Sequence, residues 1–80
     1  MPKLPQVSGE EVIRLLRALG YETLRRRGSH VRLRKVTLLG EHSITVPSHK
    51  VIAKGTLGDI LNKVSLWNSI AREDLIKKLK

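Results

Sequence analysis

Apolar residues change their spacing twice along this chain, and this change of period restricts its fold more than any other feature. Before residue 20 they recur at the helical intervals of three and four: Val12, Leu15, Leu16 and Leu19. From Tyr21 to Val46 the interval is two, which is typical of strands with one buried face. After residue 56 the helical interval returns: Leu57, Ile60, Leu61 and Val64. Eighty residues in this order predict a single domain over residues 1–80 with one modest core.

Local signals set the ends of the first elements. Ser8-Gly-Glu-Glu11 fits a capping box, so we expect a helix to begin there and to end at Gly20. Strands and turns are then expected at Tyr21–Arg27, Gly28-Ser29, His30–Leu39, Gly40-Glu41 and His42–Val46. Pro47 should end the third strand because proline lacks the N–H that a ladder needs. Residues 1–7 are expected to form a loose tail.

Two more helices are expected near the carboxyl terminus. Thr56-Leu-Gly-Asp59 resembles a capping box and predicts that the second helix opens at Thr56. After a break around 67–69, a short helix is expected over roughly Arg72–Leu79. Three antiparallel strands with one apolar face need a helical cover. The sequence therefore predicts an α+β fold of order α-β-β-β-α-α, with helices packed on one sheet face and the other face wet.

Charge indicates the kind of partner. Lys and Arg total 16 against 7 acidic residues, for a net charge of +9. An excess of this size in so small a domain points to a polyanion such as nucleic acid. Aromatic residues are scarce, which disfavours folds that stack single-stranded bases on aromatic platforms. A nucleic acid would therefore be held through its backbone charge and its shape.

Several classes of site and location are excluded or disfavoured. The chain has no cysteine, so disulfides, thiol catalysis and thiolate zinc sites are excluded. The histidine and carboxylate spacings do not fit a metal site. No apolar run is long enough to cross a bilayer, and the first residues do not fit a signal peptide. We therefore expect a cytoplasmic protein with no membrane partner.

The solvent-exposed face of the predicted sheet carries the most informative residues. If Val31 and Leu33 point inward, strand alternation points His30, Arg32 and Arg34 outward together. Residues 25–35 hold six cations and no acid, so their side chains repel unless something negative neutralises them. One interpretation is a solvated, solubilising face. The other, which the wholly basic hairpin and its one imidazole favour, is contact with phosphates.

A second basic segment, Lys54-Gly55-Thr56, precedes the second expected helix. Backbone amides at a helix amino terminus attract anions, and Lys54 adds a full charge. The plainer interpretation is that Thr56 caps the helix and Lys54 is solvated. The sequence alone leaves both open.

His30 is the candidate for acid–base chemistry. Its imidazole can accept or donate a proton. The sequence lacks a Ser-His-Asp arrangement, so the substrate would have to supply its own nucleophile. RNA does so, because its 2′-hydroxyl can attack the adjacent phosphorus once a base removes the proton.

Five segments, in order, resemble the HicA family of toxins: Glu10–Leu16, Gly20-Tyr21, Arg27-Gly-Ser-His30, Val46-Pro-Ser-His49 and Lys54–Leu61. The resemblance covers the chain from about residue 8 to 79. It implies a fold like that of double-stranded-RNA-binding domains. It further implies an mRNA-cleaving toxin that works without metal or cofactor and is neutralised by a HicB-type antitoxin protein. The catalytic histidine of the family falls on His30.

The expected site therefore has three parts. His30 acts as general base or general acid, and Gly28 and Ser29 form the turn that presents it. Arg27, Arg32 and Arg34 are the expected phosphate contacts, and Lys54 with Thr56 would hold a second phosphate. A non-catalytic double-stranded-RNA-binding module, with His30 incidental, is the competing hypothesis, and a basic accessory protein for an acidic partner is a third.

Overall fold

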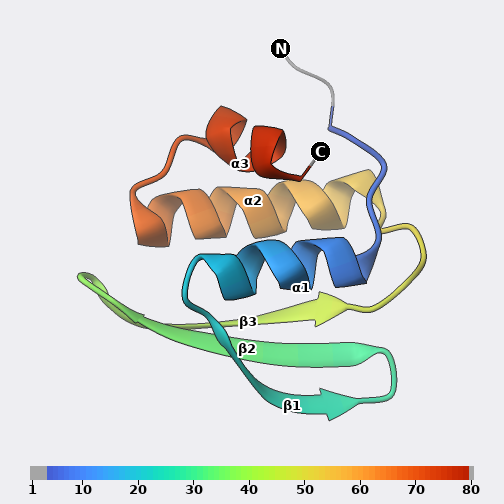
Figure 1. Ribbon diagram of the computed structural model, residues 1–80, viewed down its shortest axis with the longest axis horizontal. Coiled ribbons are helices and arrows are strands. Elements are labelled where there is room, and N and C mark those ends of the chain that lie inside the picture. The colour runs from blue at the N-terminus through green and yellow to red at the C-terminus, as the bar shows by residue number, and fades with distance from the viewer. Residues whose placement is uncertain (1–3, 80) are drawn as a thin grey trace.

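The computed structural model describes residues 4–79. Its elements are α1 (Gly9–Ala18), β1 (Glu22–Arg27), β2 (His30–Thr37), β3 (Gly40–Pro47), α2 (Lys54–Asn68) and α3 (Arg72–Lys78). The strands form one antiparallel sheet in the order β1-β2-β3. Figure 1 shows α1 and α2 side by side on one face of this sheet, with α3 beyond α2. The predicted fold class and element order are confirmed.

The start of α1 follows the predicted cap. Ser8 Oγ accepts a hydrogen bond from the Glu11 N–H at 3.1 Å. The next residue, Gly9, lies against the end of β3, where a Cβ atom would come within 2.1 Å of the Pro47 carbonyl oxygen. Its N–H donates to the His49 carbonyl at 2.8 Å. Glycine is required here because helix and strand approach too closely for any side chain.

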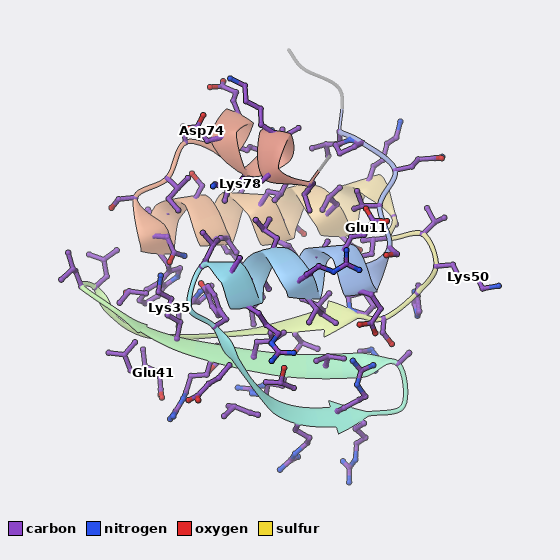
Figure 2. The ribbon with its side chains drawn as sticks, in the orientation of Figure 1. Glu11, Lys35, Glu41, Lys50, Asp74 and Lys78 are labelled. Carbon is purple, nitrogen blue, oxygen red and sulfur yellow. The ribbon has the colours of Figure 1, made fainter. Side chains whose placement is uncertain are left out.

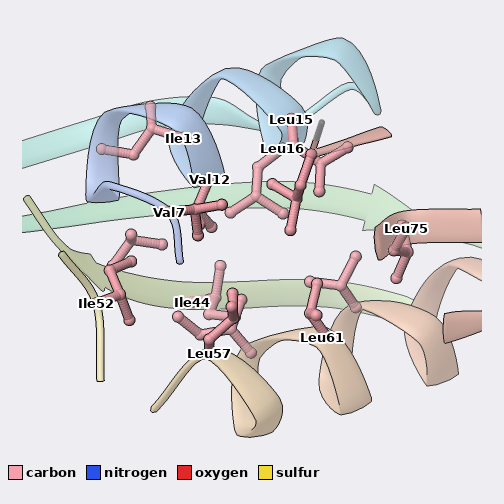
Figure 3. Packing of buried hydrophobic residues seen from close by; sticks show 14 of the residues in the cluster. Val7, Val12, Ile13, Leu15, Leu16, Ile44, Ile52, Leu57, Leu61 and Leu75 are labelled. Carbon is pink, nitrogen blue, oxygen red and sulfur yellow. The ribbon is translucent and has the colours of Figure 1, made fainter. Parts of the chain in front are cut away.

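Apolar side chains from both layers form one core between the helices and the sheet. Figure 3 shows side chains of α1 and α2 facing one another, with β3 between the two helices in this view and Leu75 of α3 at one side. The largest fully buried members are Leu16, Leu33, Leu57, Leu61 and Leu75. The core therefore joins α1, β2, α2 and α3, and removal of its area from water is the main driving force for folding.

The two faces of the sheet differ as predicted. On β2, Val31 and Leu33 are fully buried, whereas His30 and Arg32 are exposed. Ile44 and Val46 of β3 are buried on the same side as Val31 and Leu33. The helices thus cover one face and leave the other, here called the open face, to solvent (Figure 1).

The second turn of the sheet differs from the prediction. It comprises Leu38 and Leu39, not Gly40-Glu41, and β2 ends at Thr37. Thr37 Oγ1 accepts from the Leu39 N–H at 3.1 Å and donates to the Gly40 carbonyl at 2.9 Å. The Thr37 hydroxyl thus stabilises a turn that lies two residues earlier than the predicted one. Gly40, with φ +121°, is the first residue of β3. Pro47 ends β3 as predicted.

The predicted start of α2 is wrong. The helix begins at Lys54, and Ala53 occupies the N-cap position instead of Thr56. The Leu57 N–H already donates to the Ala53 carbonyl at 2.9 Å, so Thr56 lies inside the first turn with its side chain exposed. The break expected around 67–69 falls at Ser69, where φ is +53°.

The amino-terminal segment reaches the core before α1. Residues 1–3 of the expected tail lie outside the described residues. Val7 is 3% exposed, and its carbonyl accepts from the Ile52 N–H at 2.9 Å. This bond joins the segment to the loop that leads into α2.

Candidate functional site

The β1–β2 turn presents His30 at the first position of β2. Gly28 has φ +58°, the positive value that the first position of a type II′ hairpin turn needs. Arg27 then lies directly opposite His30 in the ladder. The Ser29 carbonyl accepts from the Ser48 N–H at 2.6 Å, which ties the turn to the segment after β3. The pair of Arg27 with His30 and the hydrogen bond at Ser29 therefore hold the turn, and they fix the position of the His30 backbone.

His30 lies on the open face beside other cations. Its neighbour on β1 is Arg27 and its neighbour on β3 is Pro47. The residue is exposed, as the sequence predicted. An imidazole in this position can meet a substrate without any movement of the core.

The two-residue turn decides which arginines share this face. Counted from the turn, Arg27 pairs with His30 and Arg25 pairs with Arg32. A β-bulge lies beyond these pairs, with Leu24 as the extra residue between Thr23 and Arg25, so it places Glu22 opposite Arg34 and does not alter the facing of the arginines. Four side chains therefore gather on the open face, here called the open-face cluster: Arg25, Arg27, His30 and Arg32.

Arg25 is the member of this cluster that the predicted site omitted. The segment Glu22–Arg27 has no apolar alternation from which its facing could be read. The signal that could have found it is the two-residue turn, because a turn at Gly28-Ser29 pairs Arg27 with His30 and alternation then points Arg25 to the same face.

Two other arginines are neutralised by acidic side chains. Arg26 turns toward α1 and pairs with Glu10 at 3.2 Å. Arg34 lies on the open face as predicted, but it pairs with Glu22 at 3.1 Å and with Glu41 at 2.8 Å. Hydrogen bonds to these two carboxylates raise the pKa of Arg34 above its ordinary value. None of the ion pairs found among residues 4–79 involves Arg25, Arg27 or Arg32.

The second basic segment lies at the same end of the molecule as His30. Figure 1 shows the β1–β2 turn, the end of β3 and the first turns of α1 and α2 together at this end. Lys54 and Thr56 are both exposed in the first turn of α2. The structure therefore places both parts of the expected site at one end, with Thr56 as an exposed hydroxyl and not as a cap.

The opposite end of the sheet contains a buried polar cluster that the sequence did not reveal. His42 of β3 is 5% exposed, and its Nδ1 lies 2.6 Å from the Tyr21 hydroxyl. Its ring stacks on Trp67 of α2, with centroids 4.9 Å apart. Asn68 donates to the Tyr21 hydroxyl at 3.0 Å and accepts from Lys35 Nζ at 2.5 Å. Figure 2 shows Lys35 on the helix side of the sheet here, with Glu41 on the open face.

Burial controls the protonation of this cluster. It lowers the pKa of His42, and the charge of Lys63 lowers it further. Burial raises the pKa of Tyr21, partly offset by the hydrogen bond from Asn68. A neutral His42 can accept the Tyr21 proton through Nδ1, so the pair is satisfied at neutral pH. Within the described chain no group of three or more His, Asp or Glu side chains could hold a metal ion.

The comparison with protein families identifies the chain. A family model described as "HicA toxin of bacterial toxin-antitoxin" matches residues 9–66, well over half of the 80 residues. This chain belongs to the HicA toxin family. The match runs from the first residue of α1 into the last turns of α2 and so includes the whole open face. Comparisons with curated proteins and with solved structures give no match. No helix in residues 4–79 has the length and apolar character to cross a membrane.

Proposed function

We propose that this HicA toxin is an endoribonuclease that cleaves mRNA through His30, without a metal ion. The observation that carries the proposal is the open-face cluster, in which an exposed imidazole lies beside three arginines. None of these three arginines takes part in an ion pair among the described residues. Such a site fits a phosphodiester, because guanidiniums bind the non-bridging oxygens in a fork geometry. It further suggests that a HicB-type antitoxin neutralises the toxin by covering this face.

The chemistry needs one proton-transfer group and charge stabilisation. The 2′-hydroxyl of RNA attacks the adjacent phosphorus, the bond to the 5′-oxygen breaks, and that oxygen leaves with a proton. His30 can take the first proton as a base or supply the last one as an acid. A correctly placed general acid or base contributes roughly 10²–10⁴-fold to the rate. Arg25, Arg27 and Arg32 stabilise the charge that develops on the phosphorane oxygens.

Other cations extend the RNA contact beyond the scissile phosphate. Lys54 and the Thr56 hydroxyl lie at the same end of the molecule and are proposed to hold a second phosphate. Arg34 remains a candidate contact at the far side of the cluster, but RNA must compete there with Glu22 and Glu41. We therefore expect Arg34 to contribute less than Arg32.

A non-catalytic double-stranded-RNA-binding module is the second candidate. The same basic open face favours it, since backbone charge alone holds a duplex. Both candidates predict RNA affinity that falls with salt, by about 0.7 to 0.9 in log–log slope for each phosphate neutralised. They differ in whether His30 is needed for anything beyond binding.

Replacement of His30 tests the proposal. The parent chain and His30→Ala are incubated with a long transcript, with chelator present. We expect cleavage by the variant to fall roughly 10²–10⁴-fold while its RNA affinity changes little. His49→Ala is the matched control, because His49 is an exposed histidine in the loop after β3 and should be dispensable for cleavage. Equal cleavage by the parent and His30→Ala would refute the catalytic role.

A further inference from the structure

The two outer edges of the sheet are protected to different degrees. β1 is six residues long, is broken by the bulge at Leu24 and carries three arginines. Bulges and charged side chains of this kind discourage the pairing of another strand. β3 is eight residues long and pairs with β2 in unbroken register from Gly40 to Pro47. Its middle residues, Ser43 to Thr45, are uncharged, so the outer edge of β3 lacks that protection.

The register identifies the backbone groups that this edge offers. In a two-residue hairpin the closing pair, Thr37 and Gly40, bonds to each other, so alternate residues of β3 face β2. Glu41, Ser43 and Thr45 therefore direct their N–H and C=O groups away from the sheet. The backbone groups of Pro47 also face away from β2, so its lack of an N–H removes no hydrogen bond from the β2–β3 ladder. The outer edge thus presents a run of donors and acceptors suited to a fourth strand.

A groove runs beside the same edge. It has a volume of about 350 Å³ and lies between β3 and α2, with Ser43 and Thr45 on one side and Ile60 and Lys63 on the other. Side chains that alternate along an added strand would enter this groove on one face. On the other face they would extend the open face.

Exposed apolar residues lie at the beginning of this edge. Leu38 is fully exposed, Leu39 is 62% exposed and the neighbouring Val36 is 74% exposed. Together they surround the β2–β3 turn that leads directly into β3. Exposed apolar groups of this kind mark contacts with protein, whereas the phosphates of RNA give them nothing to pack against.

We propose that the outer edge of β3 receives an extended, acidic segment of the antitoxin protein as a fourth strand. The inference rests on the antitoxin partner in the proposed function and is independent of RNA cleavage. Charge favours an acidic partner over a second copy of this chain, because each copy has a net charge of +9 and two copies would repel each other. Main-chain hydrogen bonds supply affinity in this mode of recognition, and side chains supply specificity.

The short side chains of β3 connect this edge with the open-face cluster. Thr45 lies directly opposite Arg32, and Ser43 opposite Arg34. Adjacent strands lie about 4.8 Å apart. The side chains of Ser43 and Thr45 are too short to block contact between an added strand and the guanidiniums of Arg34 and Arg32. Acidic side chains of the added strand can therefore reach Arg32 across Thr45. Strand addition at the edge would in this way neutralise the RNA-binding face beside it.

The test removes one outward N–H while leaving the ladder to β2 intact. Thr45→Pro does this, because the Thr45 N–H faces away from β2, and Thr45→Ala is the matched control that keeps the N–H. Affinity for the purified antitoxin, expected to be a HicB-type protein, is measured by calorimetry. We expect Thr45→Pro to bind about tenfold more weakly or worse and Thr45→Ala to bind nearly as the parent does. RNA cleavage by both variants should match that of the parent.

Amide hydrogen exchange of the parent chain gives an answer even if the proline variant fails to fold. The Ser43 and Thr45 amides should exchange rapidly in the free toxin and become protected at least tenfold in the complex. Unchanged exchange at these amides, or equal affinity of Thr45→Pro and parent, overturns the proposal. Self-association of the parent through this edge, detected by sedimentation, would overturn it too. A parent that cleaves RNA but never binds the antitoxin removes the partner assignment and leaves the nuclease standing.

Discussion

His30 and His42 occupy neighbouring strands of the same sheet but opposite faces of it. His30 is exposed in the open-face cluster, where its neighbours are arginines. His42 is 5% exposed under α2, where it is hydrogen-bonded to Tyr21 and stacks on Trp67. The same residue type is therefore available to a substrate in one place and is part of the core in the other. The face of the strand, and not the chemistry of imidazole, separates a candidate catalyst from a structural residue.

The largest expected difference between the faces is in stability. Leu33→Ala should lower the free energy of unfolding by about 2–5 kcal/mol, because Leu33 is fully buried and leaves a cavity. Arg32→Ala, one residue away on the open face, should change it by less than about 0.5 kcal/mol while weakening RNA binding. Urea denaturation with matched RNA titrations measures both. A large loss of stability in Arg32→Ala would contradict the division of the faces.

Removal of His42 should affect folding more than cleavage. His42→Ala takes away the hydrogen-bond partner of the Tyr21 hydroxyl and the ring that stacks on Trp67. A buried polar group that loses its hydrogen-bond partner costs about 1–3 kcal/mol, so we expect a loss of at least that size. Cleavage per folded molecule should stay at the parental rate. His30→Ala is the converse, with normal stability and little cleavage.

Acid should destabilise the protein through His42. Burial lowers the pKa of His42 in the folded chain, so the unfolded chain binds the proton more tightly. The free energy of unfolding is then highest above about pH 6.5 and falls as the pH drops toward the folded pKa, by at most about 1.4 kcal/mol per pH unit for one proton. His42→Gln should remove this slope between pH 7 and 5 in denaturation curves. The same slope in that variant would assign it to another group.

The smallest expected effects distinguish two adjacent arginines. Arg25→Ala should reduce the salt slope of RNA affinity by about 0.7, the value for one phosphate contact on a single strand. Arg26→Ala should leave that slope unchanged and cost at most about 1 kcal/mol of stability, since its pair with Glu10 is exposed. Filter binding over a salt series measures the slopes. Equal slopes for the two variants would contradict the opposite facing of Arg25 and Arg26 on β1.

Local sequence patterns predicted the structure correctly wherever they were strong. The N-cap at Ser8, the two-residue turn at Gly28 and the burial of Val31 and Leu33 are all confirmed. The errors occurred where two signals competed. Thr37 closes the second turn in place of Gly40-Glu41, and Ala53 begins α2 in place of Thr56. In the first case the Thr37 hydroxyl bridges the turn, and in the second the Leu57 N–H already bonds to the Ala53 carbonyl.

The amino-acid sequence by itself determined the element order, the apolar face of each element and the outward position of His30, because these follow from the spacing of apolar residues along the chain. The tertiary structure alone decided the bulge at Leu24, the ion pairs of Arg34 and the contacts of His42 with Tyr21 and Trp67. Each of these depends on which strand or helix lies beside the residue. Contacts between segments distant in the chain have no local signal, so only the packed layers could reveal them.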